Sequence, residues 1–404
     1  MKKPASERAV IPGGATQTKV SGVGHSPLGV VRDWHVVLVA GCNLRCSYCA
    51  TNFGKFGRPS GVMDLRTAAQ LADRIAETLD PEQRETRVSF GGGETFLNFD
   101  RFIELADLIR KRCQKRGGHA RLSVTTNGVL LDEARLRKLA RRRIGLAFSI
   151  DGPEKIHDTA RRDITGRKTF RRAFGNWSRY RAIIRNLPDA PVCNINCVFG
   201  PHSGSFGELM KFWIDQGVPL IEVVAVNHSQ FETAEHRRAT VRARARYVQG
   251  LGEWAREQAR HCSASDFLSR YRGPLILYTA WRRLFTGQEK MLCTPGRGML
   301  AVGHDGVLYP CEAYIGLDQR QIGDIFSGID HKRFAPYVAE CVKAEAFCAA
   351  CDRREACEKP CLALMTKASP RQNVRRACPF AKRVTDLSRK TFEILMNPTA
   401  EDVR

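Results

Sequence analysis

Short apolar segments alternate with longer charged segments from His35 to Asn227, and in the longer ones apolar residues recur at helical spacing. This alternation is typical of strand-helix units repeated around a parallel sheet. The six expected strands are His35–Ala40, Arg87–Gly91, Arg121–Thr126, Gly145–Ile150, Val192–Phe199 and Ile221–Val226. They predict an α/β fold, a partial (β/α)6 barrel of the TIM type. The first helices are expected at Leu65–Leu79, with Asp64 as N-cap, and at Phe99–Arg116.

At 404 residues the chain is longer than most single domains, so we expect more than one. We expect a basic extension at 1–33, the barrel at 34–231, a helical linker at 232–290 and a small cysteine-rich α+β domain at 291–404. The last of these is expected to end in a helix at Ala381–Met396. Apolar runs are only strand-sized, which argues against a signal peptide or membrane span and predicts a cytoplasmic protein.

Three cysteines, Cys42, Cys46 and Cys49, stand in a C-x3-C-x2-C run directly after the first expected strand. The chain has fifteen cysteines, and in a reducing compartment such spacings indicate metal binding rather than disulfides. A four-iron cluster usually takes four thiolates, so three would leave one iron open to a small molecule. The alternative is a zinc knuckle, although zinc motifs usually pair C-x2-C with a second pair or with histidines.

This cysteine run closely resembles that of the radical S-adenosylmethionine (SAM) superfamily, in which Tyr48 matches the usual aromatic residue. The resemblance implies one 4Fe-4S cluster at the three cysteines and SAM on its open iron. It also implies reductive cleavage of SAM to methionine and a 5'-deoxyadenosyl radical that abstracts a substrate hydrogen. Gly91, Gly92, Gly93 and Glu94 resemble the family's motif for the methionine amine; the alternative is an ordinary turn.

Polar residues at the ends of the next two expected strands suit the SAM ribose. Asn127, Ser149 and Asp151 are short hydrogen-bonding residues in that position, and the alternative is that they cap turns. Arg161, in the run His157-Asp158-x-x-Arg161, resembles an arginine that meets the SAM carboxylate in one subgroup of the superfamily.

The C-terminal part resembles the SPASM domain, which holds auxiliary iron-sulfur clusters. Its seven matching cysteines are Cys293, Cys311, Cys348, Cys351, Cys357, Cys361 and Cys378. The resemblance implies two auxiliary clusters, one held by Cys348, Cys351, Cys357 and Cys378 and the other by Cys293, Cys311 and Cys361. Several relatives carry a further cysteine that is missing from 294–303 here, so the second cluster has either an open iron or Cys341 as its fourth ligand.

Glu312 directly follows Cys311. In the anaerobic sulfatase-maturating enzymes, which this layout resembles, an aspartate at that point is a general base, so Glu312 is a candidate for the same role. The alternative is an exposed structural glutamate. Auxiliary clusters suit a reaction in which the substrate radical loses an electron, as in net oxidation or bond formation.

The formal charge of +23 comes from scattered arginines rather than from a basic block with aromatic residues. We therefore expect a solvated surface and no nucleic-acid site, although an acidic peptide would suit the charge. The first functional hypothesis is crosslinking, oxidation or epimerisation of a peptide or protein, as in ribosomal-peptide maturation. The alternatives are a small-molecule dehydrogenase or epimerase in antibiotic or cofactor biosynthesis, a sulfatase-type formylglycine maturase, and a non-catalytic scaffold.

The expected partners follow from this hypothesis. Only 41 residues precede Cys42, which is too few for a leader-binding module, so a separate recognition protein or the barrel itself would bind a leader. An external donor such as flavodoxin or ferredoxin would supply electrons.

Overall fold

The structure is a computed structural model that describes residues 30–218, 221–226, 233–261, 296, 298–349, 351, 378, 382–387, 389–391, 393 and 394. All six predicted barrel strands are present, and each pairs in parallel with the next. They are β1 (Asp33–Val36), β4 (Glu85–Phe90), β5 (His119–Thr126), β6 (Gly145–Ser149), β7 (Cys193–Phe199) and β8 (Ile221–Ala225). The prediction of a partial parallel barrel is confirmed.

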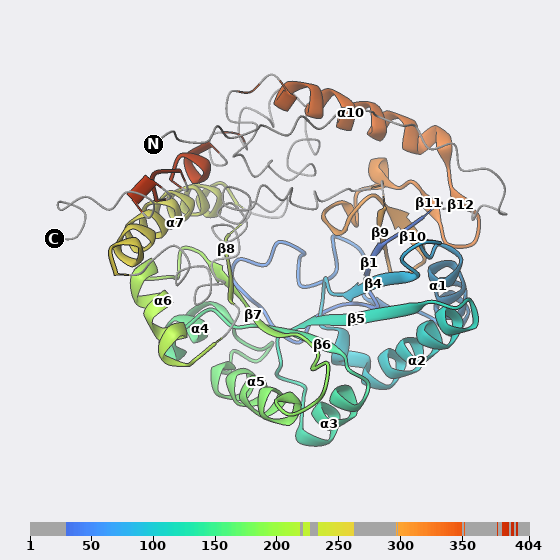
Figure 1. The fold of residues 1–404 in the computed structure, drawn as a ribbon, viewed down its shortest axis with the longest axis horizontal. Coiled ribbons are helices and arrows are strands. Elements are labelled where there is room, and N and C mark those ends of the chain that lie inside the picture. The colour runs from blue at the N-terminus through green and yellow to red at the C-terminus, as the bar shows by residue number, and fades with distance from the viewer. Residues whose placement is uncertain are drawn as a thin grey trace, which may run out of the picture.

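Helices cover the outer side of this curved sheet (Figure 1). They are α1 (Leu65–Glu77), α2 (Phe99–Lys115), α3 (Glu133–Arg141), α4 (Glu154–Ala160), α5 (Phe170–Ile184), α6 (Phe206–Asp215) and α7 (Ala234–His261). Alternate strand residues such as Val88 and Phe90 are buried in the main hydrophobic core with residues of these helices. Asp64 caps α1 as predicted, accepting from the amide of Thr67 at 2.6 Å. No helix among the described residues is long and apolar enough to cross a membrane.

The first predicted strand, His35–Ala40, is divided in two. β1 ends at Val36, and β2 (Val39–Ala40) leaves the barrel sheet to pair with β3 (Gly61–Val62) in a separate two-stranded sheet. The cysteine loop lies in the sequence between β2 and β3, so the pairing of these two strands brings its ends together. The break after β1 therefore separates the cysteine loop from the barrel sheet.

The C-terminal hairpin continues the barrel sheet instead of forming a separate one. β9 (Met299–Val302) pairs in parallel with β1, with Asp33 opposite Met299, and β10 (Val307–Tyr309) pairs antiparallel with β9. With β11 (Gly323–Asp324) and β12 (Gly328–Ile329), the sheet has ten strands. The attachment of this hairpin to the barrel edge was not predicted, because pairing between distant strands leaves no local pattern in the sequence.

Helix α10 (His331–Ala349) follows the hairpin. In the predicted terminal helix, residues 382–387 and 389–391 are helical.

Candidate functional site

Most of the predicted site residues of the barrel line one cavity of about 230 Å³ at the carboxyl ends of the strands, the usual place for active sites of such barrels. Its lining comprises Cys42, Leu44, Cys46, Cys49, Thr51, Phe53, Gly54, Gly92, Gly93, Glu94, Thr125, Thr126, Asn127, Ser149, Arg161 and Glu312. The cysteine loop, the ends of β4, β5 and β6, and the C-terminal hairpin thus meet at one place.

The three cysteines of the loop are free thiols that are partly exposed to this cavity. Backbone amides approach two of the sulfurs, from Leu44 to Cys42 at 3.4 Å and from Phe53 to Cys49 at 3.1 Å. Burial raises the pKa of Cys42 to about 12 and that of Cys46 to about 11. Thiolates at these positions therefore need a bound cation, and a metal cluster supplies it.

The three thiols are not gathered around a single point among the described residues. Zinc ligands all contact one ion, at about 2.3 Å for sulfur, whereas the described residues contain no group of three ligand side chains placed to hold a single ion. In an iron-sulfur cluster each thiolate binds a different iron. The three cysteines therefore fit a four-iron cluster with one iron left open.

The glycine run lets β4 end directly against the cysteine loop. Gly92 has a φ of +90°, and a Cβ on it would lie 2.8 Å from Val37. A Cβ on Gly93 would lie 2.1 Å from the carbonyl oxygen of Gly41, and this carbonyl accepts a hydrogen bond from the amide of Glu94 at 2.9 Å. These two glycines are needed for close approach to the loop as well as to any ligand.

Glu94 is buried, and both of its carboxylate oxygens accept hydrogen bonds. Oε1 accepts from the hydroxyl of Thr126 at 2.9 Å and from the amide of Phe96 at 3.1 Å, and Oε2 accepts from the amide of Asn127 at 2.8 Å. Burial raises the pKa of Glu94 to about 7. A ligand ammonium group next to this carboxylate would favour its ionised form.

Asn127 and Ser149 line the cavity as predicted. The side-chain amide of Asn127 donates to Oδ1 of Asn43 at 2.8 Å, and its oxygen accepts from the amide of Val129 at 2.9 Å. Asn127 thus both caps its own turn and holds the cysteine loop. Ser149 lies opposite Asn196 in the β6–β7 ladder.

Asp151 is fully buried, and it is not among the residues that line the cavity. Its Oδ2 accepts from the hydroxyl of Tyr48 and from Nε of Arg161, the latter at 2.9 Å, and Oδ1 accepts from the amide of Val198 at 3.0 Å. Burial opposes its ionisation, but Arg161 and His202 outweigh burial and hold the pKa well below its usual range. Asp151 therefore anchors its neighbours, and its predicted contact with the SAM ribose stays a prediction.

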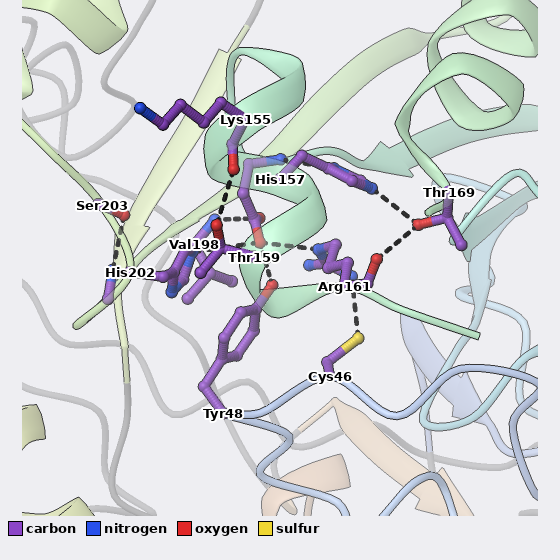
Figure 2. Close-up of polar contacts among 12 residues, drawn as sticks. Cys46, Tyr48, Lys155, His157, Thr159, Arg161, Thr169, Val198, His202 and Ser203 are labelled. Carbon is purple, nitrogen blue, oxygen red and sulfur yellow. Dashed lines mark hydrogen bonds and ion pairs between the residues drawn. The ribbon is translucent and has the colours of Figure 1, made fainter. Parts of the chain in front are cut away.

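Arg161 links this anchor to the cysteines. Its Nη1 lies 3.8 Å from the sulfur of Cys46, and the guanidinium lies 5.3 Å from the ring centroid of Tyr48. Figure 2 shows Tyr48, Arg161 and His202 converging from the cysteine loop, the end of α4 and the segment after β7. The predicted cofactor residues Tyr48 and Arg161 thus lie together, with Arg161 facing the cavity.

His202 was not among the predicted site residues. Its side chain is 4% exposed, and its Nε2 lies 3.5 Å from Oδ2 of Asp151. Burial lowers the pKa of His157 to about 4, and its neutral ring accepts a hydrogen bond at Nδ1 from the backbone amide of Asp151 at 3.3 Å. The only available clue to His202 was its position after the fifth strand, at the same edge of the sheet.

Glu312 reaches the cavity from the C-terminal hairpin. Its carboxylate lies 3.8 Å from Nδ1 of His35 on β1, and a Cβ on Gly91 would lie 3.7 Å from its Oε1. Glu312 is therefore placed beside the cysteines, as its predicted role requires, and Gly91 lies next to it.

The auxiliary cysteines are described only in part. Cys311 and Cys341 are buried in a second hydrophobic cluster with Tyr314 and Tyr337, while Cys351 and Cys378 are partly exposed. Cys293, Cys357 and Cys361, and the side chain of Cys348, lie outside the described residues. The two predicted auxiliary clusters remain predictions.

Comparisons with known proteins agree with this geometry. The family model of the radical SAM superfamily matches residues 36–212. The cysteine-type anaerobic sulfatase-maturating enzyme of Clostridium perfringens is 23% identical over 296 residues, covering 71% of this chain and 75% of that protein. An S-adenosylmethionine-dependent nucleotide dehydratase of Psychrobacter lutiphocae is 30% identical over 131 residues, covering 30% of this chain and 40% of that protein.

Among solved structures, native anSMEcpe with bound AdoMet matches with a TM-score of 0.67 at 20% identity, covering 88% of this chain and 99% of that one. This likeness shows a shared fold. The matched family range contains the three cysteines, the glycine run and Arg161. Residues 36–212 of this chain are therefore a radical SAM domain.

Proposed function

We propose that the enzyme modifies a peptide or protein by hydrogen abstraction followed by oxidation, crosslinking or epimerisation. When bound, the reduced cluster supplies the electron that splits SAM into methionine and a 5'-deoxyadenosyl radical. The chain's own residues would position this chemistry. Glu94 would face the SAM amine, Arg161 its carboxylate, and Asn127 and Ser149 its ribose.

The observation that carries the proposal is that Glu312, from the C-terminal hairpin, lines the same cavity as Cys42, Cys46 and Cys49. A carboxylate at this point can accept the proton that a substrate radical releases on oxidation. The similarity to a sulfatase-maturating enzyme supports a protein substrate, and the formal charge of +23 suits an acidic one.

Sulfatase-type maturation is the second candidate, because that relative's similarity extends over 71% of this chain. The two candidates separate by product. A formylglycine maturase oxidises one cysteine or serine of a sulfatase-derived peptide to an aldehyde, which a hydrazide probe labels, whereas a crosslinking or epimerising enzyme leaves no aldehyde.

The decisive experiment measures 5'-deoxyadenosine formed by the reconstituted, reduced enzyme with SAM in host extract, protease-treated extract and buffer. Stimulation that protease abolishes is the expected result. Stimulation of 5'-deoxyadenosine formation that survives protease would mean that the substrate is a small molecule and not a peptide, as for a metabolite dehydrogenase or epimerase. Iron analysis should give about three clusters per chain if the C-terminal cysteines bind two.

A further inference from the structure

The solvent side of the cysteine loop pairs with an exposed turn that precedes α5. Leu44 forms an antiparallel bridge with Asp163, and the amide of Arg45 donates to the carbonyl of Arg162 at 2.7 Å. Leu44 is buried and lines the cavity, whereas Arg45 and Arg162 are exposed. Because successive side chains of extended segments point to opposite sides, this small ladder has one side on the cavity and the other in solvent.

Cations lie side by side on the solvent side. Arg162 lies opposite Arg45 where the turn pairs with the cysteine loop. Within the turn, Arg162 forms an antiparallel bridge with Lys168. Arg167 lies in the same exposed turn. Like charges directly opposite one another destabilise paired segments. No ion pair of Arg45, Arg162 or Lys168 occurs in the part of the chain that the structure describes. We call Arg45, Arg162, Arg167 and Lys168 the cationic strip.

The turn holds its shape through its one acid. Oδ1 of Asp163 accepts from the amide and hydroxyl of Thr165, at 2.8 and 2.7 Å, and from the amide of Arg167 at 2.9 Å. These bonds lower the pKa of Asp163, and the bond from the Thr165 hydroxyl has the largest effect. Ile164 remains 61% exposed within the strip. A preformed basic surface with an apolar residue inside it is typical of a protein contact.

The strip is also close to the cysteines. Nη1 of Arg45 donates to the carbonyl of Cys42 at 3.0 Å, and Arg162 follows Arg161, which lies 3.8 Å from Cys46. The strip therefore includes residues of the same loop that carries the three thiols, and of the segment directly after Arg161.

We propose that the cationic strip docks an acidic electron-carrier protein that reduces the radical SAM cluster. The inference rests on the proposed function, because reductive cleavage of SAM needs an electron from outside the chain. One electron leaves the reduced flavin or iron-sulfur group of the carrier and enters the cluster at the three cysteines, and no bond or proton changes at this step. Opposite charge speeds the encounter of such partners and orients them.

The test compares wild type with the double variant Arg162→Glu and Lys168→Glu and with a control of equal charge change, Arg172→Glu and Arg242→Glu, at exposed helix positions. Stopped-flow absorbance without SAM follows cluster reduction by flavodoxin hydroquinone, an acidic probe. Reduced methyl viologen, a small cation, serves as the second reductant. Reduction by flavodoxin at low salt is expected to fall about tenfold or more in the strip variant only. Reduction by viologen should stay within about twofold in all three proteins.

Three results would overturn the proposal. The first is an unchanged rate of reduction by flavodoxin in the strip variant. The second is an equal loss of the rate of reduction by viologen, which would mean that the strip maintains the cluster itself. The third is a wild type that viologen reduces but flavodoxin does not. A strip variant that is impaired only in substrate-dependent turnover with viologen would assign the strip to an acidic substrate instead. Failure of the proposed function is separate, since it is seen as absence of 5'-deoxyadenosine from viologen-reduced wild type with SAM.

Discussion

The imidazole of His202 lies parallel to the ring of Tyr48, with centroids 5.0 Å apart and an angle of 12° between the planes. Tyr48 stands between the second and third cysteines of the loop, and His202 follows β7. The Tyr48 hydroxyl and Nε2 of His202 both reach the carboxylate of Asp151. This stack ties the cysteine loop to the far side of the barrel.

Removing the imidazole should loosen the loop. His202→Ala is expected to lower the free energy of unfolding by about 1 kcal/mol, because the ring pair is lost, and to weaken SAM binding several-fold by freeing Tyr48 and Arg161. His202→Phe keeps a ring and should recover much of the binding. Equilibrium dialysis of SAM with the reconstituted protein and iron analysis provide the measurements. Equal SAM affinity in wild type and His202→Ala would contradict a positioning role.

Gly93→Ala should prevent the cysteine loop from closing on β4. The added Cβ would meet the Gly41 carbonyl oxygen at 2.1 Å, and backbone atoms have little room to move. Iron bound after reconstitution is expected to fall to a small fraction of the wild-type value. Gly175→Ala on α5 is the control, because its Cβ would meet no atom closer than 4.0 Å, and it should stabilise the protein by up to about 1 kcal/mol. Normal iron content in Gly93→Ala would refute the steric argument.

Glu94 should make the free energy of unfolding of the apoprotein depend on pH. Its folded pKa of about 7 exceeds the usual 4.5, so between these values the folded state holds a proton that the unfolded state releases. The free energy of unfolding should therefore fall as pH rises from about 4.5 to 7, by up to about 3 kcal/mol, and level off above.

Urea unfolding of wild type and Glu94→Gln at pH 5, 6, 7 and 8 measures this difference. The variant should lack this part of the slope, while Glu133→Gln, at the exposed start of α3, should retain it. Parallel curves for wild type and Glu94→Gln would show that Glu94 does not titrate in this range.

Asp151→Asn should destabilise the fold strongly, because it leaves Arg161 buried without its counter-ion. The expected loss is about 3–5 kcal/mol. In wild type this stabilisation is present above the usual aspartate pKa of 3.8 and is lost as the pH falls through the lower folded pKa. Glu154→Gln, which breaks the exposed pair with Arg171, should cost no more than about 0.5 kcal/mol. Similar unfolding curves for the two variants would contradict the anchor role of Asp151.

The barrel could be predicted because its strands and helices carry their own periodic patterns. The cysteine loop, glycine run and Arg161 were found because their spacing is local in the sequence. The contact of Asp151 with Arg161 was not predicted, because a polar residue at a strand end looks the same in the sequence whether its carboxylate faces a ligand or a buried arginine. His202 was missed since its partners, Tyr48 and Asp151, are distant in the chain.

The pairing of β9 with β1 makes folding depend on the order of synthesis. Strand β1 emerges early, but its partner on one side, β9, is translated only after the whole barrel. Until then this edge of β1, which leads directly into the cysteine loop, lacks a neighbour and is open to wrong pairing with other chains. A fragment cut at residue 231 should therefore aggregate. The barrel edge at β1 is therefore complete only when the C-terminal hairpin has been made.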